Sequence, residues 1–180
     1  MNTKINVVDI ECTCWIDEPQ PEGEVQEIIE IGIAQLDLKT LEIEKSEGIL
    51  VRPSVSRIST SCTQLTSITP DMVELAPPFS DAVTLLEKEW NTHWFFWASY
   101  GEFDRTVFER QCENFNVNYP FGAQHINVKA VIRSVYPKVK GLGSAIKQMN
   151  MEFDGRPHRG VDDARNIALL YAKLIQKLRE

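Results

Sequence analysis

Apolar residues are spaced along the chain in patterns that predict both strands and helices. Near the start, segments rich in Ile, Val and Leu predict strands at residues 4–10, 28–38 and 43–51. Few residues separate the second and third segments, so we expect them to form a hairpin. A fourth strand is predicted at the aromatic-rich segment 94–100, whose aromatic side chains we expect to lie in the core.

The other periodic segments have the spacing of helices. Two helical pieces are predicted between residues 70 and 90, and Pro77 and Pro78 separate them because proline cannot continue a helix. Further helices are predicted at about residues 102–115, 127–136, 141–150 and from Arg159 or Gly160 to the end. This order of elements predicts an α/β fold in which helices pack on a mixed sheet. With no repeat or linker in view, we expect residues 1–180 to form a single domain.

Composition narrows the class of protein. Apolar residues make up 43% of the chain and charged residues 25%, which is typical of globular proteins. We expect a cytoplasmic protein with no membrane contact, because there is neither a long apolar run nor a signal-peptide pattern. The net charge of −7 argues against binding nucleic acid through bulk charge, but not against an enzyme that binds a short piece of it. Four cysteines without zinc-site spacing are expected to be reduced: Cys12, Cys14, Cys62 and Cys112.

The first predicted strand ends in two carboxylates on one face. Side chains alternate along a strand, so Asp9 and Glu11 follow Ile5 and Val7 on the same side. Ligands of open α/β sheets bind at this carboxyl end of the strands. The alternative is a strand that simply ends in solvent.

A third carboxylate lies at the start of the helix predicted from residue 102. At helical spacing, Asp104 shares a stripe with Val107 and Phe108, which we expect to face the core. A carboxylate in the first turn is also a common helix cap, so capping is the alternative interpretation.

The last helix contains two adjacent aspartates, and its periodicity separates them. Steps of three and four residues from Asp163 follow an apolar line: Ile167, Leu170, Leu174 and Leu178. The same steps from Asp162 reach a mixed line that we expect to be more exposed: Asn166, Leu169 and Lys173. Asp163 is therefore predicted to point inward, where a carboxylate needs a partner or a metal ion. His158 precedes this helix, and a contact that only orders the loop is the alternative for it.

Together these residues favour a metal-dependent site. Oxygen-rich clusters such as Asp9, Glu11, Asp104 and Asp163 suit Mg²⁺ or Mn²⁺. Two such ions about 4 Å apart are used for in-line phosphodiester displacement. His158 could deprotonate the attacking water, since imidazole exchanges protons near neutral pH.

Three segments resemble the exonuclease motifs of the DEDD superfamily, in its DEDDh branch: "VDIECT", "SYGEFD" and "HRGVDDARN". In that branch the last Asp follows the His as Asp163 follows His158. The segment "CTQLTSIT" (residues 62–69) is similar to the LTGI-type segment of the branch containing the histone-mRNA 3′ exonuclease and Eri-type exoribonucleases, with Ser67 in place of the usual glycine. The stretch "EIIEIGIA" also matches. The resemblance implies an RNase H-like fold with a five-stranded mixed sheet.

The resemblance also implies roles for individual residues. Asp9, Glu11 and Asp163 would hold one metal ion, Asp9 would bridge to a second, Asp104 would act through metal-bound waters, and His158 would be the general base. The residues that would contact the terminal nucleotide are Cys12, Thr13, Leu65 and Thr66, for which an ordinary place in the core is the alternative. Apart from the resemblance, four arginines close in sequence to the site are the candidates for phosphate contacts, and solvated surface charges are the equal alternative for them: Arg105, Arg156, Arg159 and Arg165.

The implied activity is 3′→5′ hydrolysis of single-stranded 3′ ends to nucleoside 5′-monophosphates, with RNA favoured and DNA possible. Two alternatives remain open. One is a non-catalytic nucleic-acid-binding or regulatory module on the same fold. The other is a hydrolase of short oligonucleotides.

Overall fold

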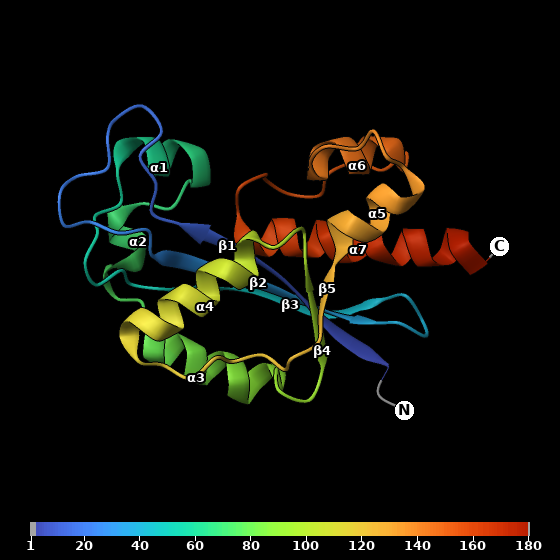
Figure 1. Cartoon of the computed structure of the whole chain (residues 1–180), viewed down its shortest axis with the longest axis horizontal. Helices are drawn as coiled ribbons and strands as arrows, with labels where there is room; N and C mark the ends of the chain where they lie inside the picture. Colours follow the sequence, from blue (N-terminus) through green and yellow to red (C-terminus); the bar gives the residue numbers. More distant parts are fainter. Residues whose placement is uncertain (1–2, 180) are drawn as a thin grey trace.

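The computed structural model describes residues 3–179, and its centre is one five-stranded mixed sheet with the strand order β3-β2-β1-β4-β5 (Figure 1). The strands are β1 (Lys4–Cys12), β2 (Ile28–Asp37), β3 (Ile43–Leu50), β4 (Phe96–Ser99) and β5 (His125–Asn127). The first three pair antiparallel, whereas β1, β4 and β5 run parallel. The predicted α/β class, mixed sheet and hairpin are confirmed.

Seven helices accompany the sheet in this part of the chain: α1 (Thr60–Thr66), α2 (Pro70–Glu74), α3 (Phe79–Trp90), α4 (Phe103–Phe115), α5 (Val128–Val135), α6 (Leu142–Gln148) and α7 (Gly160–Arg179). The two prolines separate α2 from α3, as predicted. Neither α1 nor β5 is among the predicted elements. Both are short, and the three residues of β5 are only partly buried, so neither produces a strong periodic pattern.

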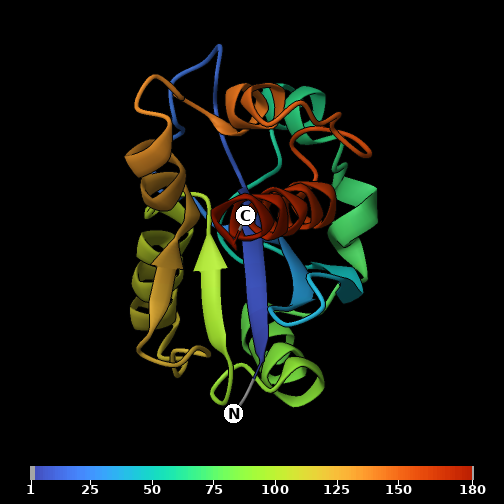
Figure 2. The same ribbon diagram turned by 90° about the vertical axis from the view of Figure 1, so that its right-hand side faces the viewer.

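The helices form a layer on each face of the sheet (Figure 2). On one face, Ile5 and Val7 of β1 pack in a cluster with residues of α5, α6 and α7. On the other face, Val8 and Ile10 pack with α3 and α4. The alternation predicted for β1 is therefore present, and the face that carries Asp9 and Glu11 is the one covered by α7.

The aromatic segment 94–100 differs from the prediction. The strand begins only at Phe96, and Trp94 and Phe96 are 83% and 51% exposed. Trp97 is buried, and its ring stacks on Phe121 with the ring centroids 4.4 Å apart. Because side chains alternate along so short a strand, the core takes Trp97 but not its aromatic neighbour at the start of β4.

Helix α7 follows the predicted core stripe for three of its members. Ile167, Leu170 and Leu174 are fully buried, but Leu178 is 62% exposed because the last turn lies beyond the core. Asn166, expected on the more exposed line, is fully buried. Its side chain exchanges hydrogen bonds with the backbone of Asp154, and these bonds compensate for its burial.

All four cysteines are free thiols, as expected. Among residues 3–179, no helix has the length and apolar content that a bilayer crossing requires.

Candidate active site

The end of β1 places two carboxylates side by side on the face under α7. Glu11 is 8% exposed, and Asp9 is partly buried. The strand continues in register with β2 up to a bulge between Glu11 and Cys12. Both carboxylates are therefore fixed to the rigid part of the sheet.

Asp104 joins them from the neighbouring parallel strand. After β4 the chain turns at Gly101, whose φ of +128° suits glycine, and α4 begins at Phe103. Asp104 is 5% exposed, and its Oδ1 accepts a hydrogen bond from the backbone N–H of Ile10 at 3.1 Å. The N-cap of α4 is Glu102, and the Asp104 carboxylate reaches across to β1 between the other two acids.

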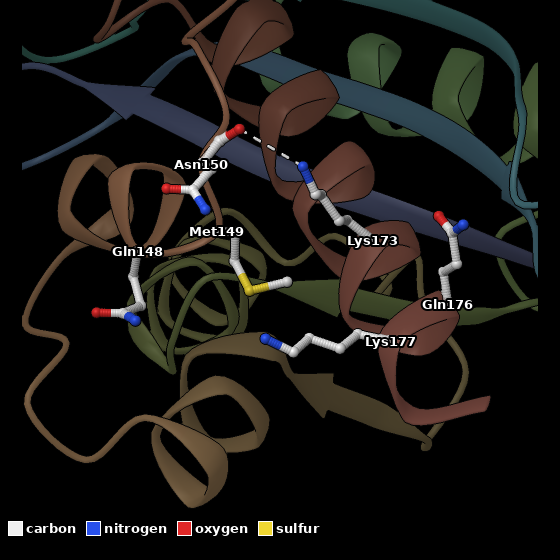
Figure 3. Close-up of a pocket in the computed structure, with 6 residues that line it drawn as sticks. All are labelled: Gln148, Met149, Asn150, Lys173, Gln176 and Lys177. Atoms are coloured by element: carbon white, nitrogen blue, oxygen red, sulfur yellow. Dashed lines mark hydrogen bonds between the residues drawn. The ribbon is translucent and has the colours of Figure 1, made fainter. Parts of the chain in front are cut away.

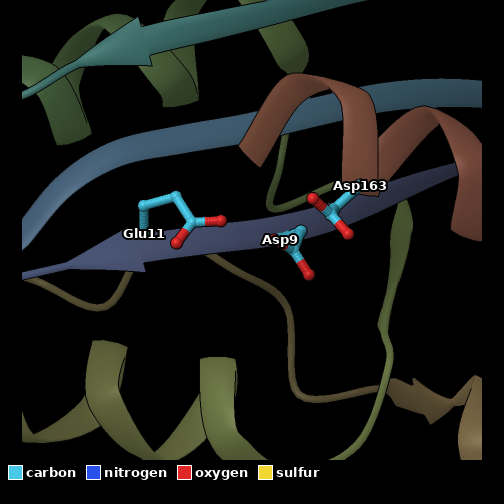
Figure 4. A group of neighbouring side chains, drawn as sticks. All are labelled: Asp9, Glu11 and Asp163. Atoms are coloured by element: carbon cyan, nitrogen blue, oxygen red, sulfur yellow. The ribbon is translucent and has the colours of Figure 1, made fainter. Parts of the chain in front are cut away.

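Asp163 completes the group from the first turn of α7. Oxygen atoms of Asp9, Glu11 and Asp163 all lie within 4.8 Å of one another (Figure 4). The Asp163 carboxylate also accepts hydrogen bonds from the backbone N–H groups of His158 and Arg159, the latter at 3.2 Å. It thus orders the preceding loop and faces the β1 carboxylates at the same time.

Asp162 has a different neighbourhood. Its two carboxylate oxygens accept hydrogen bonds from the backbone N–H of Arg156 at 2.9 Å and from the Arg165 guanidinium at 2.8 Å. A Cβ on Gly155 would lie 2.5 Å from the Asp162 Cγ, so the loop can pass this close only with glycine there. Asp162 therefore stabilises the loop through these hydrogen bonds, whereas Asp163 faces the site.

Burial and mutual repulsion keep these acids from ionising easily. Burial, followed by the charges of Asp163 and Glu30, raises the pKa of Glu11 to about 8. Burial is also the main reason that the pKa of Asp104 and that of Asp163 rise to about 6, and the pKa of Asp9 lies well above its ordinary value. A divalent cation bound among these oxygens would remove the repulsion and favour the ionised carboxylates.

Glu30 on β2 is a part of the site that the sequence reasoning missed. It lies opposite Glu11 in the sheet and is fully buried. Its Oε2 accepts hydrogen bonds from the Gly160 N–H at 2.9 Å and from Arg159 Nε at 3.1 Å, and its Oε1 accepts one from Arg159 Nη2 at 3.2 Å. An acidic residue inside the apolar run "EIIEIGIA" was the signal that could have indicated it.

Glycines make room for this contact between α7 and the sheet. A Cβ on Gly48 of β3 would lie 2.4 Å from Glu30 Oε1. A Cβ on Gly32 of β2 would lie 1.8 Å from the carbonyl carbon of Gly160. Helix α7 thus begins directly on the backbone of β2, and this close approach brings Asp163 to Asp9.

His158 is exposed and lies in the loop just before α7. Its φ of +63° is in the left-handed region, which is uncommon for a residue with a side chain. The backbone around it is held by the Asp163 carboxylate on one side of the turn and by the Glu30–Arg159 ion pair on the other. The imidazole is open to solvent and within electrostatic range of the Asp163 carboxylate.

The four residues predicted to contact a nucleotide lie where β1 ends and in α1. Cys12, Thr13 and Thr66 are buried, and Leu65 is partly exposed. The hydroxyls of both threonines donate hydrogen bonds to backbone carbonyls. Leu65 is the member of the four with accessible side-chain surface.

The candidate phosphate-binding arginines differ in their partners. Three of them pair with carboxylates: Arg105 with Glu109, Arg159 with Glu30, and Arg165 with Asp154 and Asp162. Arg156 is exposed and forms no ion pair within residues 3–179. Of the four, Arg156 has the guanidinium most available to a ligand.

Comparison with known proteins agrees with this arrangement. The model of the exonuclease (RNase T) family matches residues 7–171. The chain is 32% identical over 184 residues to 3′-5′ exoribonuclease 1 of Homo sapiens, an alignment that covers 96% of this chain and 52% of that protein. The chain therefore spans about half the length of that curated relative.

Two solved structures are similar over nearly the whole chain. The nuclease domain of 3′hExo, described as a DEDDh family member bound to rAMP, has a TM-score of 0.85 and 31% identity, with 97% of this chain and 92% of that one covered. A structure described as 3′-end specific recognition of histone mRNA stem-loop by 3′-exonuclease has a TM-score of 0.84 and 31% identity, covering 97% and 64%. The resemblance seen in the motifs is confirmed, and the chain belongs to the exonuclease family as a member of its DEDDh group.

Proposed function

We propose that this chain is a divalent-metal-dependent 3′→5′ exonuclease that releases nucleoside 5′-monophosphates from single-stranded 3′ ends. The observation that carries the proposal is the approach of Asp9, Glu11 and Asp163 oxygens to within 4.8 Å of one another, with Asp104 bonded to the same strand. Three carboxylates gathered this closely, with a fourth hydrogen-bonded to the same strand, suit a phosphodiesterase that works with metal ions.

The donor set fits Mg²⁺ or Mn²⁺. Carboxylate oxygens are the ligands that these hard cations prefer, and a bound cation would relieve the repulsion that, after burial, raises the pKa of Asp9 and that of Glu11. Asp9, Glu11 and Asp163 would hold one ion, Asp9 would also reach a second, and Asp104 would act through bound water. When bound, the ions supply Lewis-acid stabilisation of charge on the phosphoryl oxygens.

His158 is proposed as the general base. Its imidazole is exposed and within electrostatic range of Asp163, where it can accept a proton from the attacking water. The backbone bonds to Asp163 would hold the ring near that water without occupying its nitrogens.

Cys12, Thr13, Leu65 and Thr66 are proposed to form the surface against which the terminal nucleotide lies. Leu65 would supply the direct apolar contact, because it retains accessible surface. RNA is the favoured substrate, since the similar solved structures are described as bound to rAMP and as recognising a histone mRNA stem-loop. DNA is a possible second substrate.

The test is degradation of 5′-labelled RNA and single-stranded DNA, each with a free or a blocked 3′ end, in Mg²⁺, Mn²⁺ or EDTA. We expect a ladder that shortens from the free 3′ end, is absent with EDTA and is absent with the blocked end. Internal cleavage of blocked strands, or intact strands under every condition, would contradict the proposal.

A further inference from the structure

Positive charge is distributed unevenly along this acidic chain. The chain has 26 acidic residues, yet none lies in the segment 114–151. The same segment contains five basic residues: Lys129, Arg133, Lys138, Lys140 and Lys147. Although the net charge is −7, this segment is positively charged, and it forms β5, α5, α6 and the loops around them.

This stretch lies at the same end of the sheet as the carboxylates. Figure 2 shows α5 and α6 beyond the arrowheads of β4 and β5, where the chain also leaves β4 towards Asp104. Lys129 approaches the turn at Gly101, because its Cδ would lie 4.0 Å from a Cβ placed there. Gly101 is three residues before Asp104, so the positive stretch begins at the rim of the candidate active site.

From Lys129 the charges continue along α5. Arg133 is one turn further, about 6 Å along the helix axis. Its guanidinium is close enough to Tyr100 to oppose the effect of burial, which raises the pKa of that phenol to about 12. Beyond α5, a cavity of about 540 Å³ is lined by Arg133, Lys138 and Lys140, together with a proline and a valine.

Four of these cations lack anionic partners among the residues that the structure describes. Lys129, Arg133, Lys138 and Lys140 form no ion pair with any carboxylate in the part of the chain that the structure describes. By contrast, Arg105 pairs with Glu109. Like charges that gather without partners repel one another, and a polyanion bound over them would relieve that repulsion.

The positive charge also extends towards α7. Lys177 Nζ lies 5.3 Å from the ring centroid of Tyr136, the residue that ends α5. Figure 3 shows Lys177 and Lys173 on α7 beside Met149 at the end of α6, around a cavity of about 330 Å³. The positive region thus continues from the rim of the site to the C-terminal half of the last helix.

We propose that Lys129, Arg133, Lys138 and Lys140, here called the α5 basic surface, bind the phosphodiester backbone of the substrate strand upstream of its 3′ end. The inference rests on the proposed function, because it takes the bound strand to be the one whose terminus lies at Asp104. Lysine and arginine contacts to phosphates give affinity without reading sequence. Because the rest of the molecule is negative, the surface would also guide the strand into one path.

The first test is binding without cleavage. Affinity for a 5′-labelled single-stranded RNA is measured in EDTA by fluorescence anisotropy over a range of salt concentrations. The variants are Lys129→Gln/Arg133→Gln and Lys138→Gln/Lys140→Gln. Lys39→Gln/Lys88→Gln is the matched control, because it removes the same charge from exposed positions after β2 and in α3.

We expect each test pair to weaken binding by on the order of fivefold per lost phosphate contact at about 0.1 M salt, and to reduce the slope of log affinity against log salt by about 0.7 per contact. The control pair should behave as the wild type. Affinities and slopes equal to those of the control would overturn the inference. So would variants that lose binding to vesicles of anionic phospholipid while RNA binding stays unchanged.

A second readout separates this inference from the proposed function. In Mg²⁺ or Mn²⁺, the test pairs should lower kcat/KM for long strands by a larger factor than for a dinucleotide, because a longer strand contacts more of the α5 basic surface. If the wild type binds RNA but cleaves nothing, the proposed function fails and the salt slopes still decide the inference. If long strands and dinucleotides are cleaved at wild-type rates by all variants, the exonuclease stands and the α5 basic surface does not.

Discussion

At the scale of single residues, the site is a place where the folded protein carries unfavourable charge. Asp9, Glu11 and Asp163 are close together and partly or largely buried, so their ionisation is opposed by both desolvation and repulsion. The folded state therefore holds protons on these acids at pH values where the unfolded chain has released them. The binding of divalent cations should reverse this penalty.

The first prediction concerns stability against pH in EDTA. The pKa of Asp104 and that of Asp163 rise to about 6, and that of Glu11 to about 8, while ordinary values are near 4. Because the folded state binds more protons than the unfolded state in this window, the free energy of unfolding should fall as the pH rises from 5 to 8. The melting temperature measured in EDTA should fall accordingly.

Two comparisons sharpen that measurement. Mg²⁺ or Mn²⁺ should raise the melting temperature most at pH 8, and Asp163→Asn should weaken both the pH dependence and the response to the metal ions. A melting temperature that is constant or rises from pH 5 to 8, with no response to either ion, would contradict a metal-binding carboxylate group.

The second prediction separates His158 from the metal ligands. His158→Ala should reduce kcat by about 10²- to 10⁴-fold, the usual contribution of a general base. It should leave the metal-induced rise in melting temperature unchanged, because the imidazole is not a proposed ligand. A variant that keeps wild-type kcat would show that this histidine only orders the loop.

Residue patterns predicted which carboxylates lie together, but not the hydrogen-bonded residues that hold their loops and helices in place. Strand alternation was enough to place Asp9 with Glu11, and helical spacing was enough to separate Asp163 from Asp162. Glu30 was missed because its partner Arg159 lies 129 positions away, and local patterns do not report so distant a contact. The burial of Asn166 was mispredicted because its amide bonds to the backbone of Asp154 in the loop before α7, a contact that helical periodicity does not report.

At the scale of elements, the contact between β2 and the start of α7 decides where Asp163 lies. The helix begins on the bare backbone of Gly32, and the Glu30 carboxylate binds both the Gly160 N–H and the Arg159 guanidinium. One turn later the chain reaches Asp163. We therefore expect changes at this contact to act on the site through the position of α7.

The third prediction tests the close approach of backbone to backbone. Gly32→Ala should destabilise the protein by about 3 kcal/mol or more, because the new Cβ would lie 1.8 Å from the Gly160 carbonyl carbon. Gly143→Ala in α6 is the control: its Cβ would meet nothing within 4 Å, so stability should be unchanged or rise by up to about 1 kcal/mol. Denaturant unfolding measures both. Equal stability of the two variants would show that α7 does not need this contact.

The fourth prediction concerns the ion pair between β2 and α7. In a double-mutant cycle with Glu30→Gln and Arg159→Gln, the two changes should couple by about 1–3 kcal/mol in the free energy of unfolding, because Glu30 is fully buried and bound through both oxygens. Additive effects would mean that the pair contributes nothing beyond its separate side chains.

At the scale of the whole molecule, the order of the strands brings segments that are distant in sequence together at the carboxyl end of β1. Because β1 lies between β2 and β4, the end of β1 meets both the start of α4 and the start of α7. Periodicity predicted the long elements and the α/β class. It did not predict β5 or α1, because short elements gain their stability from neighbours rather than from their own pattern.

The distribution of charge is another property that the sequence totals did not predict. A value of −7 suggested little attraction for nucleic acid, yet residues 114–151 contain five basic residues and no acidic residue. The topology places the basic α5 beside the turn that leads to Asp104, and only the fold reveals that neighbourhood. Total charge thus describes the average field of the molecule and not the field at the site.

The measurement that tests the central claim most directly is the rate of nucleoside 5′-monophosphate release from single-stranded RNA by two neighbouring variants, Asp163→Asn and Asp162→Asn. Both remove one negative charge from the first turn of α7, but only Asp163 approaches Asp9 and Glu11. We predict that Asp163→Asn loses at least about 100-fold in rate, since even indirect supports of a metal site cost 10- to 100-fold. Asp162→Asn should stay within about tenfold of the wild type. Equal rates for the two variants, or a greater loss in Asp162→Asn, would contradict the assignment of the active site to this carboxylate group.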